Sequence, residues 1–152
     1  MDQPVEAIVN AWNRNFIPWW LLLPQGVSRA IKRRGGYAPF KELAKKGIMP
    51  LGGAVLTGAG RLPFKGIIHV AGLNWFWRSS STAVERSVYS AVEIINQEGF
   101  NSAAFPLIGA GTGGLGQEQV RDLMLETFEK CDFKAKIVIS VLNDLEPMQT
   151  AP

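Results

Sequence analysis

The stretch of sequence that decides the fold reads Ala104-Phe105-Pro106-Leu107-Ile108-Gly109-Ala110-Gly111-Thr112-Gly113-Gly114. It is an apolar run closed by glycines, which predicts a buried strand followed by a loop with exposed backbone N–H groups. Such a loop suits a phosphate, although glycine loops after strands are also common as ordinary turns. The stretch becomes specific when it is read together with two earlier segments, Ile8-Val9-Asn10-Ala11-Trp12-Asn13 and Gly26-Val27-Ser28-Arg29-Ala30-Ile31.

Hydrophobic periodicity extends the pattern to the whole chain of 152 residues. We expect strands at residues 5–10, 53–57, 66–70, 103–108 and 137–142, and helices at residues 26–34, 39–46, 82–98 and 117–130. The continuous apolar character of residues 53–57 and 66–70 predicts strands that are buried on both faces. Strands that alternate with helices predict one α/β domain, a three-layer α/β/α sandwich with a mixed, largely parallel central sheet. Residues 144–152 are expected to be a frayed tail.

Local signals refine three of the helices. We expect Ser28 to cap the first helix, and Ser81 or Thr82 to cap the helix over residues 82–98. An inward stripe is expected on that helix at Val84, Val88, Ala91, Val92 and Ile95. A second stripe is expected on the helix over residues 117–130, at Val120, Leu123, Met124, Thr127 and Phe128.

Cysteine usage and hydropathy exclude several classes of protein. The single cysteine, Cys131, rules out an internal disulfide and is typical of a reducing compartment, so we expect a cytoplasmic protein. One Cys and one His are too few soft ligands for a structural zinc site, and we expect neither a metal nor a cofactor. No run of about 18 apolar residues predicts a transmembrane segment, and the N-terminus lacks the pattern of a secretory signal.

The net charge of +3 is unevenly distributed along the sequence. Basic residues gather in one region, at Arg29, Lys32, Arg33, Arg34, Lys41, Lys45 and Lys46. Three interpretations stay open for them: a solvated face, assistance in binding an anionic ligand, or a surface for nucleic acid.

Taken together, the three quoted segments make residues 5–142 resemble a macrodomain, the fold that binds ADP-ribose. The resemblance implies that Asn13 reaches the distal ribose, and that the backbone at Val27, Ser28 and Arg29 lies against the diphosphate. The glycine loop after residue 108 would clamp the diphosphate from the other side. The ligand-binding residues implied are Asn10, Asn13, Gly26, Val27, Ser28, Arg29, Ile108, Gly109, Ala110, Gly111, Thr112, Gly113 and Gly114, with Asn13 as the catalytic candidate.

Each of these features also has a plain structural interpretation from the residues alone. The asparagines can simply bend the chain, the helix can be an ordinary helix, and the glycine loop can be a flexible turn. His69 matches the family's strand that ends in His-x-x-Gly, but a lone His on an apolar strand is more often a core residue. The aromatic run at residues 75–77 is suited either to packing or to stacking on a base.

Four departures from the macrodomain pattern bear on function. The family usually begins with further strands and a Gly-Asp-Ile-type turn whose Asp binds the adenine amine, and this sequence starts after them. We therefore expect the adenine contact to be missing or replaced. Ser28 stands where hydrolytic members carry Asp, and Arg29 stands where a small residue is usual. The aromatic residue that often flanks the distal ribose is absent at Thr112 and Gly113.

Three functions compete on this basis. Binding of ADP-ribose or of an ADP-ribosylated target is favoured, because none of the three loops carries a carboxylate that could orient a water molecule. An ADP-ribosyl hydrolase is the first alternative, since the ligand's own diphosphate can hold a water; Glu42 and Asp144 are the nearest acidic candidates. A module that binds nucleic acid or a protein partner is the second alternative.

The segment at residues 16–23, Phe-Ile-Pro-Trp-Trp-Leu-Leu-Leu, is longer and more apolar than the family's usual connection. Exposed, it would form an apolar patch with two Trp side chains, which is typical of an interface. We expect it to close over the ligand as a lid. A homodimer interface and a membrane-surface contact beside the basic residues are the alternatives.

Overall fold

A computed structural model describes residues 4–12, 26–73, 78–110 and 114–140. The strands are β1 Ala7–Trp12, β2 Ala54–Thr57, β3 Gly66–Ala71, β4 Ser102–Pro106 and β5 Lys136–Ser140. The helices are α1 Gly26–Gly35, α2 Ala38–Ala44, α3 Ser81–Glu98 and α4 Gln117–Glu129. The predictions for Asn13, residues 16–23 and 75–77, Gly111, Thr112, Gly113 and the tail lie outside the described residues.

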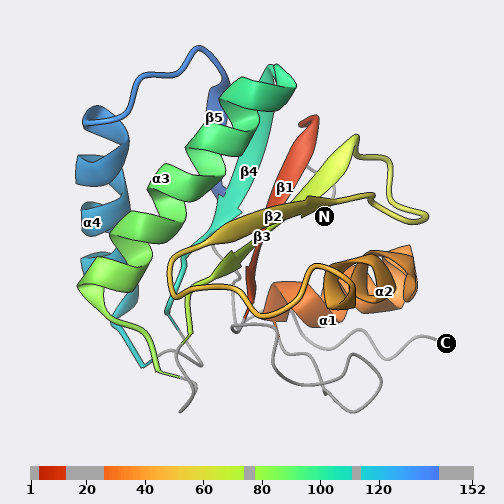
Figure 1. Ribbon diagram of the computed structural model, residues 1–152. Helices are drawn as coiled ribbons and strands as arrows, with labels where there is room; N and C mark the ends of the chain where they lie inside the picture. Colours follow the sequence, from red (N-terminus) through yellow and green to blue (C-terminus); the bar gives the residue numbers. More distant parts are fainter. Residues whose placement is uncertain (1–3, 13–25, 74–77, 111–113, 141–152) are drawn as a thin grey trace, which may run out of the picture.

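The strands form one sheet with the order β2-β3-β1-β4-β5. All neighbouring strands are parallel except β2 and β3, which are antiparallel. Figure 1 shows α3 and α4 on one face of this sheet and α1 and α2 on the other. The expected three-layer α/β/α sandwich with a mixed, largely parallel sheet is therefore confirmed.

Successive side chains of the central strands point to opposite faces of the sheet, so the hydrophobic core is divided into two clusters. On β1, Ala7 and Val9 pack in the cluster under α3 and α4, whereas Ile8 and Trp12 pack in the cluster under α1 and α2. The first cluster includes the whole predicted stripe of α3, and Val120, Met124 and Phe128 of the predicted stripe of α4. Leu123 packs against the cluster but is only partly buried, and Thr127 is buried. Phe105 of β4 meets Phe128 of α4 edge to face at 5.0 Å between ring centroids. The second cluster holds Ile31 of α1 with Phe40 and Leu43 of α2.

Several sequence predictions need correction. The strand expected at residues 103–108 is Ser102–Pro106, and the helix expected at residues 39–46 is Ala38–Ala44. The first strand begins and ends two residues later than expected, so that it continues to Trp12. The strand β2 is not buried on both faces, because it is at the edge of the sheet, and three of its four residues are partly exposed. The cap of α3 is Ser80, whose hydroxyl accepts a hydrogen bond from the Ala83 N–H at 3.2 Å, one residue before the expected Ser81.

The described residues contain no helix that is long and apolar enough to cross a membrane.

The turn between β2 and β3 rests on the end of α1, and Gly60 makes that contact. Gly60 has a φ of +59°, and a Cβ on it would lie 2.3 Å from the carbonyl oxygen of Gly35, the last residue of α1. The same carbonyl accepts a hydrogen bond from the Arg61 N–H at 3.1 Å. The close approach of two backbones here fixes the C-terminal end of α1 relative to the sheet.

We therefore expect Gly60→Ala to lower the free energy of unfolding by about 2 kcal/mol or more, because it adds a backbone clash to the strain of a positive φ. The matched control is Gly47→Ala, since Gly47 also has a positive φ of +77° but has nothing within 4 Å of its Cβ position. That substitution should lower the unfolding free energy by only about 1 kcal/mol. Urea denaturation followed by circular dichroism measures both, and equal losses would contradict the proposed contact.

Candidate functional site

The order of the strands creates a switch point between β1 and β4. The chain leaves β1 toward α1 on one face of the sheet, and it leaves β4 toward α4 on the other face (Figure 1). The two strands pair only through Ala7 with Ala103 and Ile8 with Ala104, near the amino end of β1. In open α/β sheets, ligands bind outside the carboxyl ends of strands at such a switch point.

Three segments meet at this edge of the sheet. The Gly72 N–H, directly after β3, donates a hydrogen bond to the carbonyl of Trp12 at the end of β1, at 3.1 Å. A Cβ on Gly72 would lie 2.8 Å from Cγ2 of Ile108, just after β4, so these residues are in contact. The ends of β1, β3 and β4 are thereby brought together.

A chain of buried polar side chains ties this edge to α1. The Ser28 hydroxyl donates to Oδ1 of Asn10 at 2.7 Å, and Nδ2 of Asn10 lies 3.0 Å from Nδ1 of His69. Nε2 of His69 lies 2.9 Å from Oγ1 of Thr57, whose hydroxyl donates to the Gly58 carbonyl at 3.0 Å. All four side chains are buried, and Asn10 and His69 have no exposed surface.

These contacts fix the tautomer of His69. An amide nitrogen can only donate, so Nδ1 of His69 accepts the hydrogen bond from Asn10 and carries no proton. The proton therefore resides on Nε2 and is donated to Thr57, whose own hydrogen is directed to Gly58. Burial lowers the pKa of His69 to about 3, so the ring is neutral at physiological pH. His69 is thus a fully hydrogen-bonded core residue, the alternative that the sequence favoured.

Two sequence predictions change as a result. Ser28 does not cap α1, because it lies inside the helix and its hydroxyl reaches across to Asn10. The Asn10 side chain has no exposed surface, and its amide is hydrogen-bonded to Ser28 and His69, so its side chain is placed to support the site rather than to contact a ligand. Val27 is partly buried and Arg29 is exposed beside Ser28 in the first turns of α1.

The glycine loop is closed at its base. The Leu115 N–H donates to the Gly109 carbonyl at 3.1 Å, the Ala110 N–H donates to the Leu107 carbonyl at 3.3 Å, and Ala110 and Leu115 form an isolated bridge. Gly109 has a φ of +85°, which favours glycine. Ile108 is buried and anchors the loop in the core.

Sequence reasoning missed two residues that flank this loop. Oγ of Ser79 lies 2.5 Å from the position that a Cβ on Gly109 would occupy, and Nη1 of Arg78 lies 3.3 Å from the corresponding position at Gly114. The Ser79 hydroxyl is buried and has no hydrogen-bond partner within the described part of the chain, and the same holds for the Trp12 indole N–H. The polar cluster before the 82–98 helix suggested only a helix cap, so nothing in the sequence indicated this contact.

Glu42, one of the two acidic candidates, lies away from the switch point. Its carboxylate accepts a hydrogen bond from the Gly58 N–H at 2.9 Å, directly after β2. Because β2 is antiparallel to β3, Thr57 pairs with Ile67 near the start of β3, whereas the end of β1 pairs with Ala71. At about 3.3 Å per residue, these points are about 13 Å apart along the strands. Asp144 lies outside the described residues.

Because His69 is buried in its neutral form, the free energy of unfolding depends on pH. Below pH 6.5 the unfolded chain takes up a proton that the folded chain does not, so the free energy of unfolding falls as the pH is lowered toward 3. Between pH 7.5 and 5 we expect a loss of about 2 kcal/mol from this one group. Urea denaturation at each pH measures the loss, and the chain holds no second His that could mask it.

The matched variant is His69→Gln, which lacks the titrating group. It should be less stable at pH 7.5 and should show little change down to pH 5. Glu6, whose pKa is lowered to about 2 chiefly by a hydrogen bond from Lys65, loses its contribution only at lower pH. If the His69→Gln variant loses as much unfolding free energy between pH 7.5 and 5 as the native protein does, His69 is not the cause of the pH dependence.

Comparison with known proteins agrees with this architecture. The family model of the Macro domain matches residues 9–124. The chain is 37% identical over 126 residues to an uncharacterized protein of Aquifex aeolicus, covering 81% of this chain and 76% of that protein. It is 32% identical over 132 residues to O-acetyl-ADP-ribose deacetylase 1 of Pantoea vagans, covering 83% of this chain and 74% of that protein.

Solved structures share the fold at lower identity. A mutant of the Oceanobacillus iheyensis macrodomain superposes with a TM-score of 0.79 at 22% identity, covering 93% of this chain and 79% of that chain. The Trypanosoma brucei macrodomain, solved in complex with ADP-ribose, gives a TM-score of 0.74 at 20% identity, covering 92% of this chain and 59% of that chain. The family match over most of the sheet and the identity to the curated relatives lead to one conclusion: this chain belongs to the macrodomain family.

Proposed function

We propose that the protein binds ADP-ribose, free or attached to a modified target, at the switch point between β1 and β4. The observation that carries this proposal is the hydrogen bond from Ser28 to Asn10, which holds the first turns of α1 against β1. That bond directs the N-terminal end of a ten-residue helix to the edge where the glycine loop begins. Free N–H groups and the positive end of a helix dipole are suited to a diphosphate.

In this proposal, the ligand's diphosphate lies between two sets of backbone N–H groups. One set comes from Val27, Ser28 and Arg29, and the other from residues 108–114. The guanidinium of Arg29 pairs with the diphosphate, since the positive end of the helix repels a cation unless an anion is present. Asn13, which follows β1 directly, binds the distal ribose. The complex of ADP-ribose with the Trypanosoma brucei macrodomain supports the choice of ligand.

Hydrolysis is the second candidate, because the Pantoea vagans relative is named an O-acetyl-ADP-ribose deacetylase. The described site residues offer little for such chemistry. The Ser28 hydroxyl is already a donor to Asn10, and neither α1 nor the described ends of the glycine loop carry a carboxylate. Any hydrolysis would depend on Asn13 and on a water held by the ligand's own diphosphate. We therefore propose binding as the main function.

Residues 16–23 connect the two elements that line this site, β1 and α1. We propose that they close over the bound ligand as a lid, with a homodimer contact as the alternative. A lid predicts that the fluorescence of Trp19 or Trp20 changes when ADP-ribose is added and that light scattering gives the mass of a monomer. A homodimer contact predicts the mass of a dimer and no change in fluorescence.

The test of the proposed function is calorimetric titration with ADP-ribose and with AMP. ADP-ribose should bind more tightly, because AMP lacks the second phosphate and the distal ribose. Asn13→Ala should raise the Kd for ADP-ribose by about 5- to 30-fold, the effect of losing a buried hydrogen bond of about 1–2 kcal/mol.

Gln97→Ala provides the control, because Gln97 is exposed on α3 and its side chain donates a hydrogen bond to Glu93 on the same helix, at 3.4 Å. That variant should bind as the native protein does. No heat of binding with ADP-ribose at any accessible concentration, or equal affinity for AMP, would contradict the proposal.

A further inference from the structure

The two helical layers of the protein carry opposite charge. Residues 26–46, which form α1, α2 and their flanks, contain seven Lys or Arg residues and one acid, Glu42. The helices α3 and α4 contain seven acids and two Arg residues. On a surface that only needs to be soluble, positive and negative side chains are mixed. Here the positive side chains lie on one helical layer and the negative ones on the other, so solubility alone does not explain their distribution.

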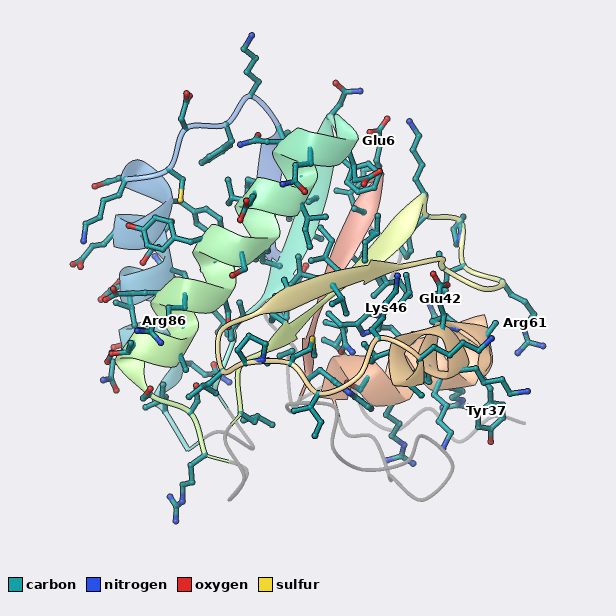
Figure 2. The ribbon with its side chains drawn as sticks, viewed as in Figure 1. Glu6, Tyr37, Glu42, Lys46, Arg61 and Arg86 are labelled. Atoms are coloured by element: carbon teal, nitrogen blue, oxygen red, sulfur yellow. The ribbon has the colours of Figure 1, made fainter. Side chains whose placement is uncertain are left out.

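The cations of the α1–α2 layer are displayed to solvent. Six of the seven are exposed, and Lys32 is partly exposed. Arg61 joins them from the β2–β3 turn, with Nη2 3.6 Å from the position that a Cβ on Gly36 would take between the two helices. Figure 2 shows Arg61, Lys46 and Tyr37 around these helices. Arg29 belongs to the proposed diphosphate site, and we call the other cations the basic face: Lys32, Arg33, Arg34, Lys41, Lys45, Lys46 and Arg61.

The one acid in this layer is engaged elsewhere. The Glu42 carboxylate accepts the Gly58 N–H at 2.9 Å, so it is directed to the turn after β2. Cations at the C-terminal ends of α1 and α2 complement the negative ends of these helix dipoles. They are Lys32, Arg33 and Arg34 in α1, and Lys41 with the C-cap residue Lys45 in α2. The dipoles do not account for Arg61 in the β2–β3 turn. Like charges held together lower the stability of a compact fold, and binding of a polyanion offsets that repulsion.

An aromatic ring lies among these charges. Tyr37, between α1 and α2, is 49% exposed, and Nζ of Lys32 lies 5.0 Å from its ring centroid. Basic residues interleaved with an exposed aromatic ring are typical of surfaces that follow a phosphate backbone and stack a base. The apolar side of α1 and α2 is buried, with Ile31, Phe40 and Leu43 at 0–2% exposure. The face therefore lacks the exposed apolar stripe that a membrane-surface helix needs.

We propose that the basic face binds single-stranded nucleic acid through its phosphate backbone, as a site separate from the one that binds ADP-ribose. Arginine forks and lysine ammonium groups pair with successive phosphates, and Tyr37 stacks against an unpaired base. The α1 residues of the face lie in the last turn of that helix, whereas the proposed diphosphate site lies at its first turns. The placement of the face does not depend on the proposed function.

The test compares two triple variants that lose the same charge. The first is Arg33→Gln, Lys45→Gln and Lys46→Gln on the basic face. The control is Arg121→Gln, Lys130→Gln and Lys134→Gln, three exposed cations on and after α4. Fluorescence anisotropy follows binding of labelled DNA and RNA strands of about 12 nucleotides, at several salt concentrations from about 50 mM upward.

We expect the face variant to bind the strands at least 10-fold more weakly, and the dependence of log K on log salt to become shallower by about 2. The control should stay within about twofold of the native protein, and both variants should keep their thermal stability and their affinity for ADP-ribose. Four results would overturn the proposal: no binding at about 50 mM salt, equal losses in both variants, tighter binding of duplex than of single strands, or equal competition by polyglutamate. If the native protein binds the strands but does not bind ADP-ribose, the proposed function is refuted and the proposal for the basic face stands.

Discussion

The hydrogen-bonded chain of Ser28, Asn10, His69 and Thr57 is the interaction on which the rest of the structure depends. It links α1, β1, β3 and β2 through side chains that are all buried. Burying four polar side chains is tolerable because each of them is hydrogen-bonded to the next. Removing one member would strand its neighbours, at about 1–3 kcal/mol for each group left unpaired. The four hydrogen-bonded side chains therefore hold α1 in one position on the sheet.

That position determines what the switch point can bind. Asn10 lies two residues before the end of β1, so Ser28 places the first turns of α1 beside the strand ends. The contact of Gly72 with Ile108 brings the start of the glycine loop to the same edge. In the proposed function, backbone N–H groups from these two segments, about 80 residues apart in sequence, bind one diphosphate. The outer side of the same helix carries the cations of the basic face, so α1 serves both proposed ligands.

The sequence predicted those parts of the fold that local pattern controls. The inward stripes of α3 and α4 and the full burial of β3 follow from periodicity, and the structure confirms them. The edge position of β2 was missed, because the apolar run Ala54–Thr57 does not reveal which strands will be its neighbours. The error at Ser28 has the same origin. A hydroxyl near a helix start predicts a cap, but its partner here is Asn10, 18 residues earlier, which only the tertiary fold brings near. Arg78 and Ser79 were missed because their contact with the glycine loop joins segments about 30 residues apart.

His69 offers the most direct test of the central claim, because it is the chain's one histidine and its ring signals need no assignment by mutation. A ¹⁵N–¹H correlation spectrum of the imidazole distinguishes the two tautomers and the charged form. The account predicts a proton on Nε2, none on Nδ1, and no change from neutral pH down to about pH 5, more than a unit below the usual pKa of histidine. A proton on Nδ1, or a ring that titrates near pH 6.5, would contradict the hydrogen-bonded chain that holds α1 to the sheet.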